Sequence, residues 1–349
     1  MMENGHIGEV TLACIENMLI ACSAFDYTGD LGIVKQKLGE LEKACGDKAC
    51  GDPFLLFNWG ERSVKGYAAE ACYPVTAPVT GNGIYTKEFE GGEAFTLGYR
   101  GGYGAINDGY KKIFRFAHER GVQPGMEFLE VYRSGAPVDD GNDEMELIMM
   151  IHPWMQLLKG GLEDVLGRED SLELIRGLED INPMTDLEDR FSKIKWFLED
   201  LEGLSDDDQR YEIMSGCADR FSKKRIKLLR DIYLKKRNVD DVIDFMKKEQ
   251  DWYSEPWRDE EGIHIIKVPY RRKEYDKAET PEEKRKYYCH CPIVRGRLDD
   301  GMPSTYCLCG SGWFRQVWEG ILERPVRVRM LRSLLKGDDC CEFVVEMPP

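Results

Sequence analysis

The chain has 349 residues, of which 42% are hydrophobic and 32% are charged, and its formal net charge is -16 at pH 7. This composition is typical of a globular protein, and the length allows two or three domains with a core each. The acidic balance argues against nucleic acid as a partner, because neutralising phosphates needs a basic face. No apolar stretch reaches the roughly 18 residues of a membrane span, and the first residues lack a signal-peptide pattern. We therefore expect a cytoplasmic protein without a membrane partner.

The N-terminal part of the chain contains an internal repeat. Residues 16–46 align without a gap with residues 91–121, and each copy runs from an apolar strand through a polar turn into an amphipathic helix that ends at a glycine. Glu16-Asn17 interrupts the strand in the first copy and Gly91-Gly92 in the second, which we interpret as a break within one strand. Two further strands follow each helix. The repeat predicts one pseudo-symmetric domain over residues 1–154, built from two strand-helix-strand-strand units.

The two copies differ in the first strand after the helix. The second copy has Phe128-Leu129-Glu130-Val131-Tyr132 where the first has Phe54-Leu55-Leu56-Phe57-Asn58, so Glu130 stands at the position of Leu56. A glutamate in an apolar strand is either exposed to solvent or, when buried, costly unless it has a partner. This difference makes Glu130 the leading candidate for a functional residue.

The middle of the chain has a different pattern. After the repeat the strand pattern disappears, and the sequence becomes strongly charged with apolar residues at helical spacing. Thr185 with Glu188, and Ser205 with Asp208, have the spacing of capping boxes ahead of two helices. We expect a helical connector over residues 155–261.

Residues 262–349 return to mixed structure. A strand-like run opens this part, a helix with several aromatic residues follows near residues 312–322, and Gly337-Asp338-Asp339 predicts a turn before the last strand. We expect a C-terminal α+β domain that ends in a hairpin. The predicted fold class of the whole chain is therefore α+β.

The last domain carries two Cys-x-Cys units. If each unit directs two thiolates at one ion, the four sulfurs form a tetrahedral set for zinc or an iron-sulfur cluster. The predicted ligands are Cys289, Cys291, Cys307 and Cys309. Reactive or redox thiols and buried structural cysteines are the alternatives.

The cysteine-bearing tail resembles a group of bacterial proteins. They share the order Cys-x-Cys-Pro, then Cys-x-Cys-Gly/Ser-x-Gly-Trp, then Gly-Asp-Asp-x-Cys-x-Phe, which matches residues 289–292, 307–313 and 337–343. More distantly, the tail is similar to vinyl-reductase-type ligand-binding domains. The resemblance assigns no catalytic residue, and it implies a second module that senses a small molecule or a metal.

Residues 8–154 resemble the GyrI-like family, the effector-binding domain of AraC-type and MerR-type multidrug regulators. The similarity lies in a turn rich in glycine and tyrosine at residues 98–103, a helix that carries Tyr110, and a Glu-x-Tyr strand at residues 130–132. The resemblance implies two packed copies that hold a small hydrophobic or cationic molecule between them, without a cofactor. It also implies that Glu130 binds the cation and that four tyrosines form the walls: Tyr99, Tyr103, Tyr110 and Tyr132.

The same resemblance leaves other functions open. Some members of the family resemble hydrolases that open strained cyclopropane rings, in which case Glu130 would activate water and Tyr132 would protonate the leaving group. Inhibition of DNA gyrase by protein contact is a third role in the family. A transcription regulator would need a basic DNA-binding element, but we interpret the basic run from Lys223 to Arg237 as the solvated face of a helix.

Overall fold

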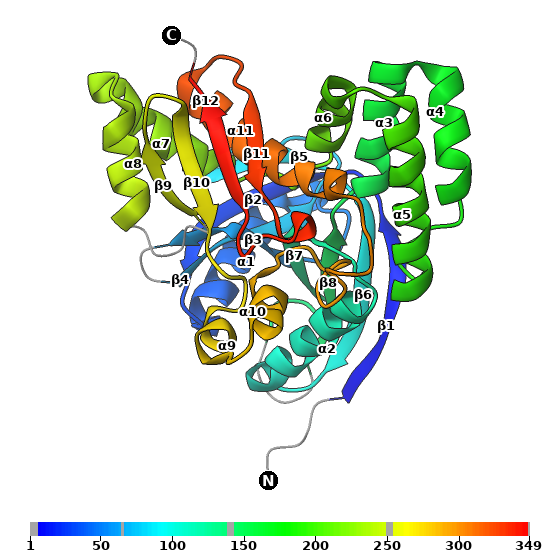
Figure 1. Cartoon of the computed structure of the whole chain (residues 1–349). Helices are drawn as coiled ribbons and strands as arrows, with labels where there is room; N and C mark the ends of the chain where they lie inside the picture. Colours follow the sequence, from blue (N-terminus) through cyan, green and yellow to red (C-terminus); the bar gives the residue numbers. More distant parts are fainter. Residues whose placement is uncertain (1–5, 64–65, 138–142, 249–253, 348–349) are drawn as a thin grey trace. The chain divides into compact units, whose positions relative to one another are not determined.

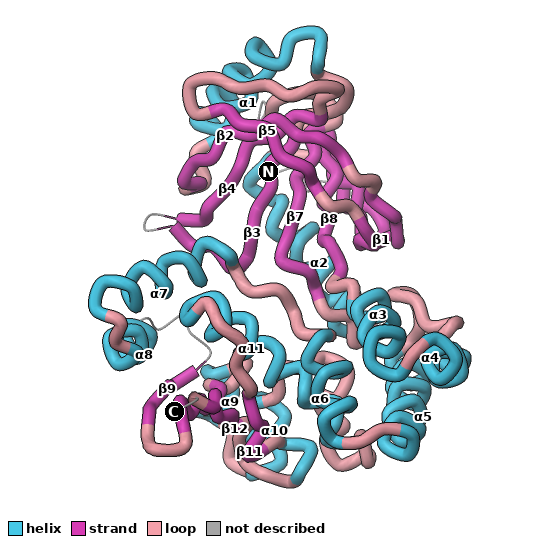
Figure 2. The backbone as a smooth tube through the Cα atoms, turned by 90° about the horizontal axis from the view of Figure 1, so that it is seen from above, coloured by secondary structure: helices cyan, strands magenta, loops and turns pink. Residues whose placement is uncertain are grey.

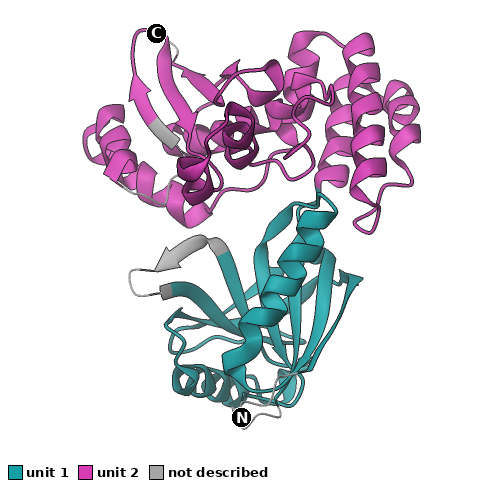
Figure 3. Cartoon of the chain, turned by 60° about the horizontal axis from the view of Figure 1, so that its bottom comes forward, with its two compact units in different colours: residues 1–153 teal, residues 154–349 magenta. Residues whose placement is uncertain are grey.

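A computed structural model describes residues 6–63, 66–137, 143–248 and 254–347. The chain is an α+β protein, as predicted, and it divides into two compact units, unit 1 (Met1–Pro153) and unit 2 (Trp154–Pro349), which Figure 3 colours separately. Residues 249–253 of the predicted connector lie outside the described residues. In the part of the chain that the structure describes, we find no helix with the length and apolar character that a membrane span requires.

Unit 1 is built on one eight-stranded antiparallel sheet with two helices. The strand order is β1-β6-β8-β7-β3-β4-β2-β5. Exchanging each strand with its counterpart in the repeat reverses this order, so a pseudo-twofold axis passes between β3 and β7. The strands are β1 (His6–Ile15), β2 (Met18–Tyr27), β3 (Phe54–Ser63), β4 (Gly66–Pro74), β5 (Ile84–Phe89), β6 (Gly92–Arg100), β7 (Pro124–Tyr132) and β8 (Glu144–Ile151), and the helices are α1 (Leu31–Cys45) and α2 (Ile106–Glu119).

Each copy of the repeat contains one strand more than predicted. The interrupted strand is two strands, because β1 pairs with β6 whereas β2 pairs with β4 and β5. The two interruptions lie beside each other, and the Gly91 N–H donates to Asn17 Oδ1 at 2.8 Å. A Cβ atom on Gly91 would lie 2.0 Å from the Ile15 carbonyl oxygen. Gly91 therefore permits the close passage of two connections.

The two helices leave the middle strands of the sheet between them. Helix α1 packs against β2 and β4, and α2 packs against β1, β6 and β8. Strands β3 and β7 lie side by side at the centre (Figure 2). Both helices and the sheet face beneath them share one hydrophobic core, whose members include Val34, Leu38, Leu55, Ile113 and Phe128. A side chain on this face of β3 or β7 is thus positioned at the pseudo-twofold axis.

Unit 2 combines helices with a smaller antiparallel sheet of strand order β11-β12-β10-β9. Helices α3, α4 and α5 lie side by side (Figure 1). The strands are β9 (Ser254–Arg258), β10 (Gly262–Lys267), β11 (Val328–Arg332) and β12 (Glu342–Glu346). The helices are α3 (Trp154–Leu166), α4 (Arg168–Ile175), α5 (Leu187–Leu204), α6 (Asp207–Gly216), α7 (Lys223–Lys236), α8 (Val239–Lys248), α9 (Arg272–Lys277), α10 (Pro281–Tyr288) and α11 (Leu308–Leu322).

The helical segment and the cysteine-bearing tail share a core within unit 2. Leu158 and Phe197 belong to the same hydrophobic cluster as Val294 and Leu334. Helix α11 approaches its neighbours through glycines, since a Cβ atom on Gly312 would lie 1.8 Å from a carbonyl oxygen of α6. This close contact ties the tail to the preceding helices.

The two predicted capping boxes are each wrong by one residue. The N-cap of α5 is Asp186, whose side chain accepts a hydrogen bond from the backbone N–H of Asp189. The N-cap of α6 is Asp206, which forms a complete capping box with Gln209. Thr185 instead accepts from the Asn182 N–H at 3.1 Å. An aspartate next to the predicted serine or threonine provides the same acceptor, so the spacing alone cannot choose between them.

Candidate functional site

Glu130 lies in the central strand β7 and is almost completely buried. Only 3% of the surface of Glu130 is exposed to solvent. Side chains alternate along a strand, so Glu130 shares its face with Phe128 and Tyr132, both of which belong to the core under the helices. Its register partner across the axis is Leu55 on β3. The sequence therefore places a carboxylate among apolar side chains at the point where the two copies of the repeat meet.

The residue of the first copy that corresponds to Glu130 is Leu55, so the prediction that Leu56 corresponds to it is wrong. Leu56 pairs with Leu129, and both belong to a core cluster on the opposite face of the sheet. A shift of one residue in a strand moves the side chain to the other face. The two copies do differ by a leucine and a glutamate at this position, but the leucine is Leu55.

Three tyrosine hydroxyls converge on the Glu130 carboxylate. Tyr110 on α2 donates to Oε1 at 2.6 Å, and Tyr132 on β7 donates to Oε2 at 3.2 Å. Tyr103, in the short 3₁₀ turn before α2, also donates to Oε2. A turn, a helix and a strand thus supply one hydroxyl each. The structure brings together Glu130 and three of the four predicted tyrosines.

The fourth predicted tyrosine has a different role. Tyr99 on β6 is buried in the same core, but its hydroxyl donates to the Gly102 carbonyl oxygen at 2.6 Å. This bond holds the turn that leads into Tyr103. Tyr99 therefore supports the position of a residue that touches the carboxylate.

Tyr27 is a member of the cluster that the sequence analysis missed. Its hydroxyl and that of Tyr103 share a hydrogen bond, and burial, together with the charge of Glu130, raises the pKa of Tyr27. The Tyr27 ring also packs edge-on against Phe57, with 5.4 Å between ring centroids. Tyr27 lies shortly before α1, as Tyr103 lies shortly before α2. This correspondence within the repeat is the signal that could have identified it.

Burial dominates the electrostatics of the cluster. Desolvation raises the pKa of Glu130, and the hydrogen bonds from Tyr103, Tyr110 and Tyr132 oppose that rise without cancelling it. Burial and the charge of Glu130 together raise the pKa of each of these tyrosines. The tyrosines therefore remain protonated donors at neutral pH. The cluster carries at most one negative charge, which resides on the carboxylate.

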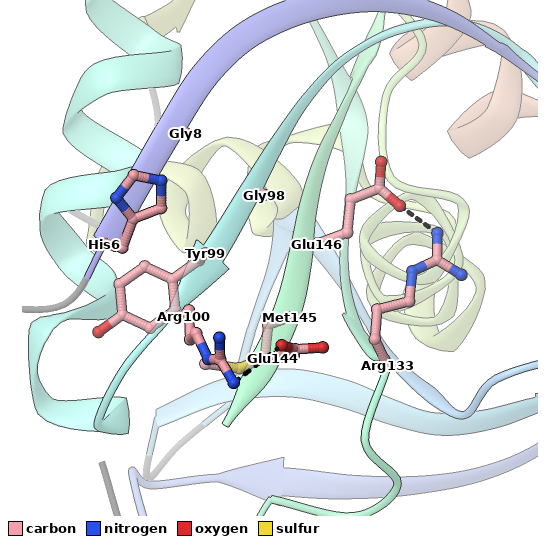
Figure 4. Close-up of a pocket in the computed structure, with 9 residues that line it drawn as sticks. All are labelled: His6, Gly8, Gly98, Tyr99, Arg100, Arg133, Glu144, Met145 and Glu146. Carbon is pink, nitrogen blue, oxygen red and sulfur yellow. Dashed lines mark hydrogen bonds and ion pairs between the residues drawn. The ribbon is translucent and has the colours of Figure 1, made fainter. Parts of the chain in front are cut away.

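A separate hollow lies on unit 1 at β1, β6 and β8 (Figure 4). It is open to solvent and has a volume of about 410 Å³, and its residues are His6, Gly8, Gly98, Tyr99, Arg100, Arg133, Glu144, Met145 and Glu146. Its charges are paired with one another, since Arg100 contacts Glu144 at 3.3 Å and Arg133 contacts Glu146. Glu130 is not among its lining residues. We therefore assign the candidate site to the buried cluster.

The cysteines of the two Cys-x-Cys units meet in unit 2. The side chain of Cys291 hydrogen-bonds with those of Cys289 and Cys309, and these bonds lower the pKa of Cys291. Cys307 and Cys341 lie close enough to interact electrostatically with Cys291. Within the described ranges, no group of three or more histidine, cysteine, aspartate or glutamate side chains is arranged to hold a metal ion. The zinc or iron-sulfur site stays a prediction.

Comparisons with known proteins find solved structures that are similar to part of the chain. No protein-family model and no curated protein matches the chain. Among solved structures, the C-terminal domain of EcmrR is 17% identical with a TM-score of 0.37, covering 41% of this chain and 97% of that one. A hydrolase encoded by lin2189 from Listeria innocua is 10% identical with a TM-score of 0.31, covering 41% and 91%. SAV2435 bound to tetraphenylphosphonium is 11% identical with a TM-score of 0.32, covering 42% and 96%. Likenesses of this size assign no function to the chain.

Proposed function

We propose that unit 1 binds a hydrophobic organic cation at Glu130, for sensing or sequestration. The observation that carries this proposal is the buried carboxylate with tyrosine hydroxyls around it. Among the described residues, the hydrogen-bond partners of Glu130 are Tyr103, Tyr110 and Tyr132, and no lysine, arginine or histidine pairs with it. A buried acid of this kind lacks the cation that would offset its desolvation.

An arriving cation relieves a cost that the protein already bears without it. The raised pKa of Glu130 shows that burial disfavours the charged form. A cation beside the carboxylate favours that same charged form, because opposite charges attract strongly where water is excluded. A hydrophobic cation loses little hydration on entering such a site, whereas a small hydrated ion loses much. The chemistry therefore favours bulky cations with delocalised or shielded charge.

Aromatic rings around the carboxylate suit such a ligand. Phe114 stacks on Phe128 at 5.2 Å between centroids, and Tyr110 lies 6.4 Å from the same ring. Tyr110, Phe114, Tyr27 and Phe57 are half-buried rather than buried, so this side of the cluster reaches the surface. Each ring whose face contacts the cation contributes about 0.5–2 kcal/mol. The half-buried rings come from both copies of the repeat, which supports a site shared by the two halves.

Hydrolysis at the same carboxylate is the second candidate function. A pKa raised by burial suits a general base, which supports this alternative. However, the three tyrosines donate to Glu130 itself, and a carboxylate has about four acceptor positions. Little capacity remains to orient a water molecule, and Tyr132 would have to leave Glu130 to protonate a leaving group. The observed arrangement favours binding.

Calorimetric titration of the full chain with tetraphenylphosphonium tests the binding proposal. We expect saturable binding of one cation per chain that exceeds the affinity for neutral triphenylphosphine oxide. Equal affinities for the charged and neutral compounds would contradict it. For the alternative, incubation with strained cyclopropane compounds and mass spectrometry should reveal addition of water, and unchanged substrate would count against hydrolysis.

A further inference from the structure

Helix α7 carries a concentration of positive charge in a chain that is acidic overall. Residues 223–237 include eight lysines and arginines and one aspartate, whereas the whole chain has a net charge of -16. Lys227 and Lys235 are exposed, and within the described ranges neither has an ion-pair partner. The helix therefore presents positive charge to solvent.

The exposed side of α7 also carries apolar side chains. Positions three and four apart share one face of a helix. Leu228 is 47% exposed and Leu234 is 39% exposed, while Leu229 is buried in the core. Lysines that surround exposed leucines suit a partner with both acidic and apolar groups. We call the exposed positions at this spacing the basic face: Lys224, Lys227, Leu228, Asp231, Leu234 and Lys235.

Helix α5 presents a surface of the opposite charge. Residues 196–208 contain six aspartates and glutamates and no lysine or arginine. Trp196 is 62% exposed and Leu204 is 56% exposed. A tryptophan of this kind is typical of the residues that anchor protein interfaces. We call the exposed positions at helical spacing the acidic face: Trp196, Glu199, Asp200, Gly203 and Leu204.

The two faces do not meet within one chain. Helix α7 packs on α8 and α11, whereas α5 packs on α4 and on the short turns at Arg176–Leu178 and Ser304–Cys307. Figures 1 and 2 both show α7 and α5 at opposite ends of unit 2. The acidic complement of the basic face is therefore on another molecule. Every copy of this chain carries such a complement on α5.

We propose that the basic face of α7 docks on the acidic face of α5 of a second copy of this chain. The lysines then lie against carboxylates, and Leu228 and Leu234 contact Trp196 and Leu204. A nucleic-acid backbone offers no apolar group to the leucines. An anionic membrane would cover α7 and leave Trp196 exposed. A second copy covers the exposed apolar side chains of both helices with one kind of contact.

A single pair of helices makes this a small interface. Helix α7 has 14 residues and is about 21 Å long, so the contact buries less than the roughly 1,200 Å² of a standard protein interface. Interfaces of this size give weak, reversible association. Since the two faces lie at opposite ends of unit 2, two chains that run in opposite directions make the contact twice. The second contact strengthens the first.

Sedimentation velocity of the full chain over a wide range of concentration measures this association. We expect wild type to form larger species as the concentration rises. The double variants Lys227→Glu/Lys235→Glu and Glu199→Lys/Asp200→Lys should each weaken association by at least about tenfold, because like charges then face each other. The first variant makes the net charge more negative and the second makes it less negative. A loss in both therefore excludes an effect of net charge alone.

A mixture of the two variants gives the sharpest result. Each variant carries two faces of one sign, and its opposite is present on the other variant, so an equimolar mixture should associate as wild type does. Lys273→Glu/Lys277→Glu is the matched control, because these exposed lysines of α9 remove the same charge away from both faces. The control should also associate as wild type does.

Cross-linking of wild type keeps the proposal testable if a variant fails to fold. A carbodiimide joins an amine directly to a carboxylate, so a mixture of isotopically labelled and unlabelled chains should yield links between Lys227 or Lys235 of one copy and Glu199 or Asp200 of another. Wild type that stays monomeric at every concentration would overturn the proposal. So would association that neither double variant weakens, or binding of a monomeric chain to phosphatidylserine vesicles that Lys227→Glu/Lys235→Glu abolishes.

Discussion

Replacing Glu130 with glutamine tests the proposed cation site by removing the charge while keeping the shape. Glutamine retains one carbonyl oxygen, which accepts either from Tyr110 or from Tyr103 and Tyr132, and its NH2 group donates to the hydroxyl oxygen on the other side once that hydroxyl turns. The size and shape of the side chain are kept, and the negative charge is removed. We therefore expect Glu130→Gln to fold and to bind hydrophobic cations more weakly.

The size of the effect follows from the burial of the carboxylate. The phenyl groups of tetraphenylphosphonium keep its charge about 6 Å from the nearest oxygen, and at an effective dielectric constant of about 20 Coulomb's law gives about 3 kcal/mol. The three hydroxyls that already hydrogen-bond Glu130 spread part of its charge. If about half of the attraction remains, the dissociation constant rises by roughly tenfold, or 1.4 kcal/mol.

Isothermal titration calorimetry of wild type and variant at one pH and one salt concentration measures this difference. Glu144→Gln is the matched control, because Glu144 lies on the neighbouring strand β8 with its side chain 51% exposed. It removes the same charge from the chain without touching the cluster. Neutral triphenylphosphine oxide should bind wild type and Glu130→Gln alike. Equal affinities of wild type and Glu130→Gln for tetraphenylphosphonium would refute the assignment of Glu130 as the anchor.

Three further predictions follow from the geometry. Burial raises the pKa of Glu130 in the folded state, so the contribution of Glu130 to the free energy of unfolding is present below the ordinary glutamate range and is lost as pH rises through the raised pKa. Cation affinity should increase over the same pH range. The difference between wild type and Glu130→Gln in the free energy of urea unfolding should therefore change with pH, and parallel curves would contradict this. Tyr110→Phe removes the donor to Oε1, which should raise the pKa of Glu130 further and shift the pH midpoint of cation binding upward; an unchanged or lower midpoint would count against the hydrogen bond. Gly312→Ala places a Cβ atom 1.8 Å from the Ser215 carbonyl oxygen and should destabilise unit 2 by about 1–3 kcal/mol in urea unfolding. The control Gly203→Ala adds a Cβ atom at a helix position with no neighbour within 4 Å, so its free energy of unfolding should equal or exceed that of wild type.

The duplicated fold could be predicted because hydrophobic periodicity and helix ends are local signals. The helices near residues 31–45 and 106–119 follow from apolar residues at helical spacing. The break at Gly91-Gly92 was harder to interpret. A local pattern shows that a strand is interrupted, but only the pairing of β1 with β6 and of β2 with β4 shows that two separate strands are present.

The candidate site could be predicted only in part. Glu130, Tyr103, Tyr110 and Tyr132 were identified, yet Tyr99 and Tyr103 lie close together in the sequence and have different contacts. Which hydroxyl reaches a carboxylate depends on side-chain directions that tertiary packing determines, and a motif does not specify them. The comparison of Glu130 with Leu56 failed by one residue because it matched Phe128 to Phe54, whereas the offset that aligns residues 16–46 with 91–121 leads from Glu130 to Leu55, which lies on the same face of the sheet.

Glu130 lies at the pseudo-twofold axis, so the proposed site stands where the two copies of the repeat meet. Residues at the axis of a duplicated sheet face their own counterparts, so Leu55 and Glu130 are direct neighbours across β3 and β7. Two leucines there would complete an apolar core. One glutamate instead introduces a single buried charge that aromatic side chains from both copies surround, including Tyr27 from the first and Tyr103 from the second. The axis also keeps the site between the helices, because α1 and α2 pack on the flanking strands. One residue on one side of the axis thus gives the symmetric fold an asymmetric buried charge, on which the proposed cation site depends.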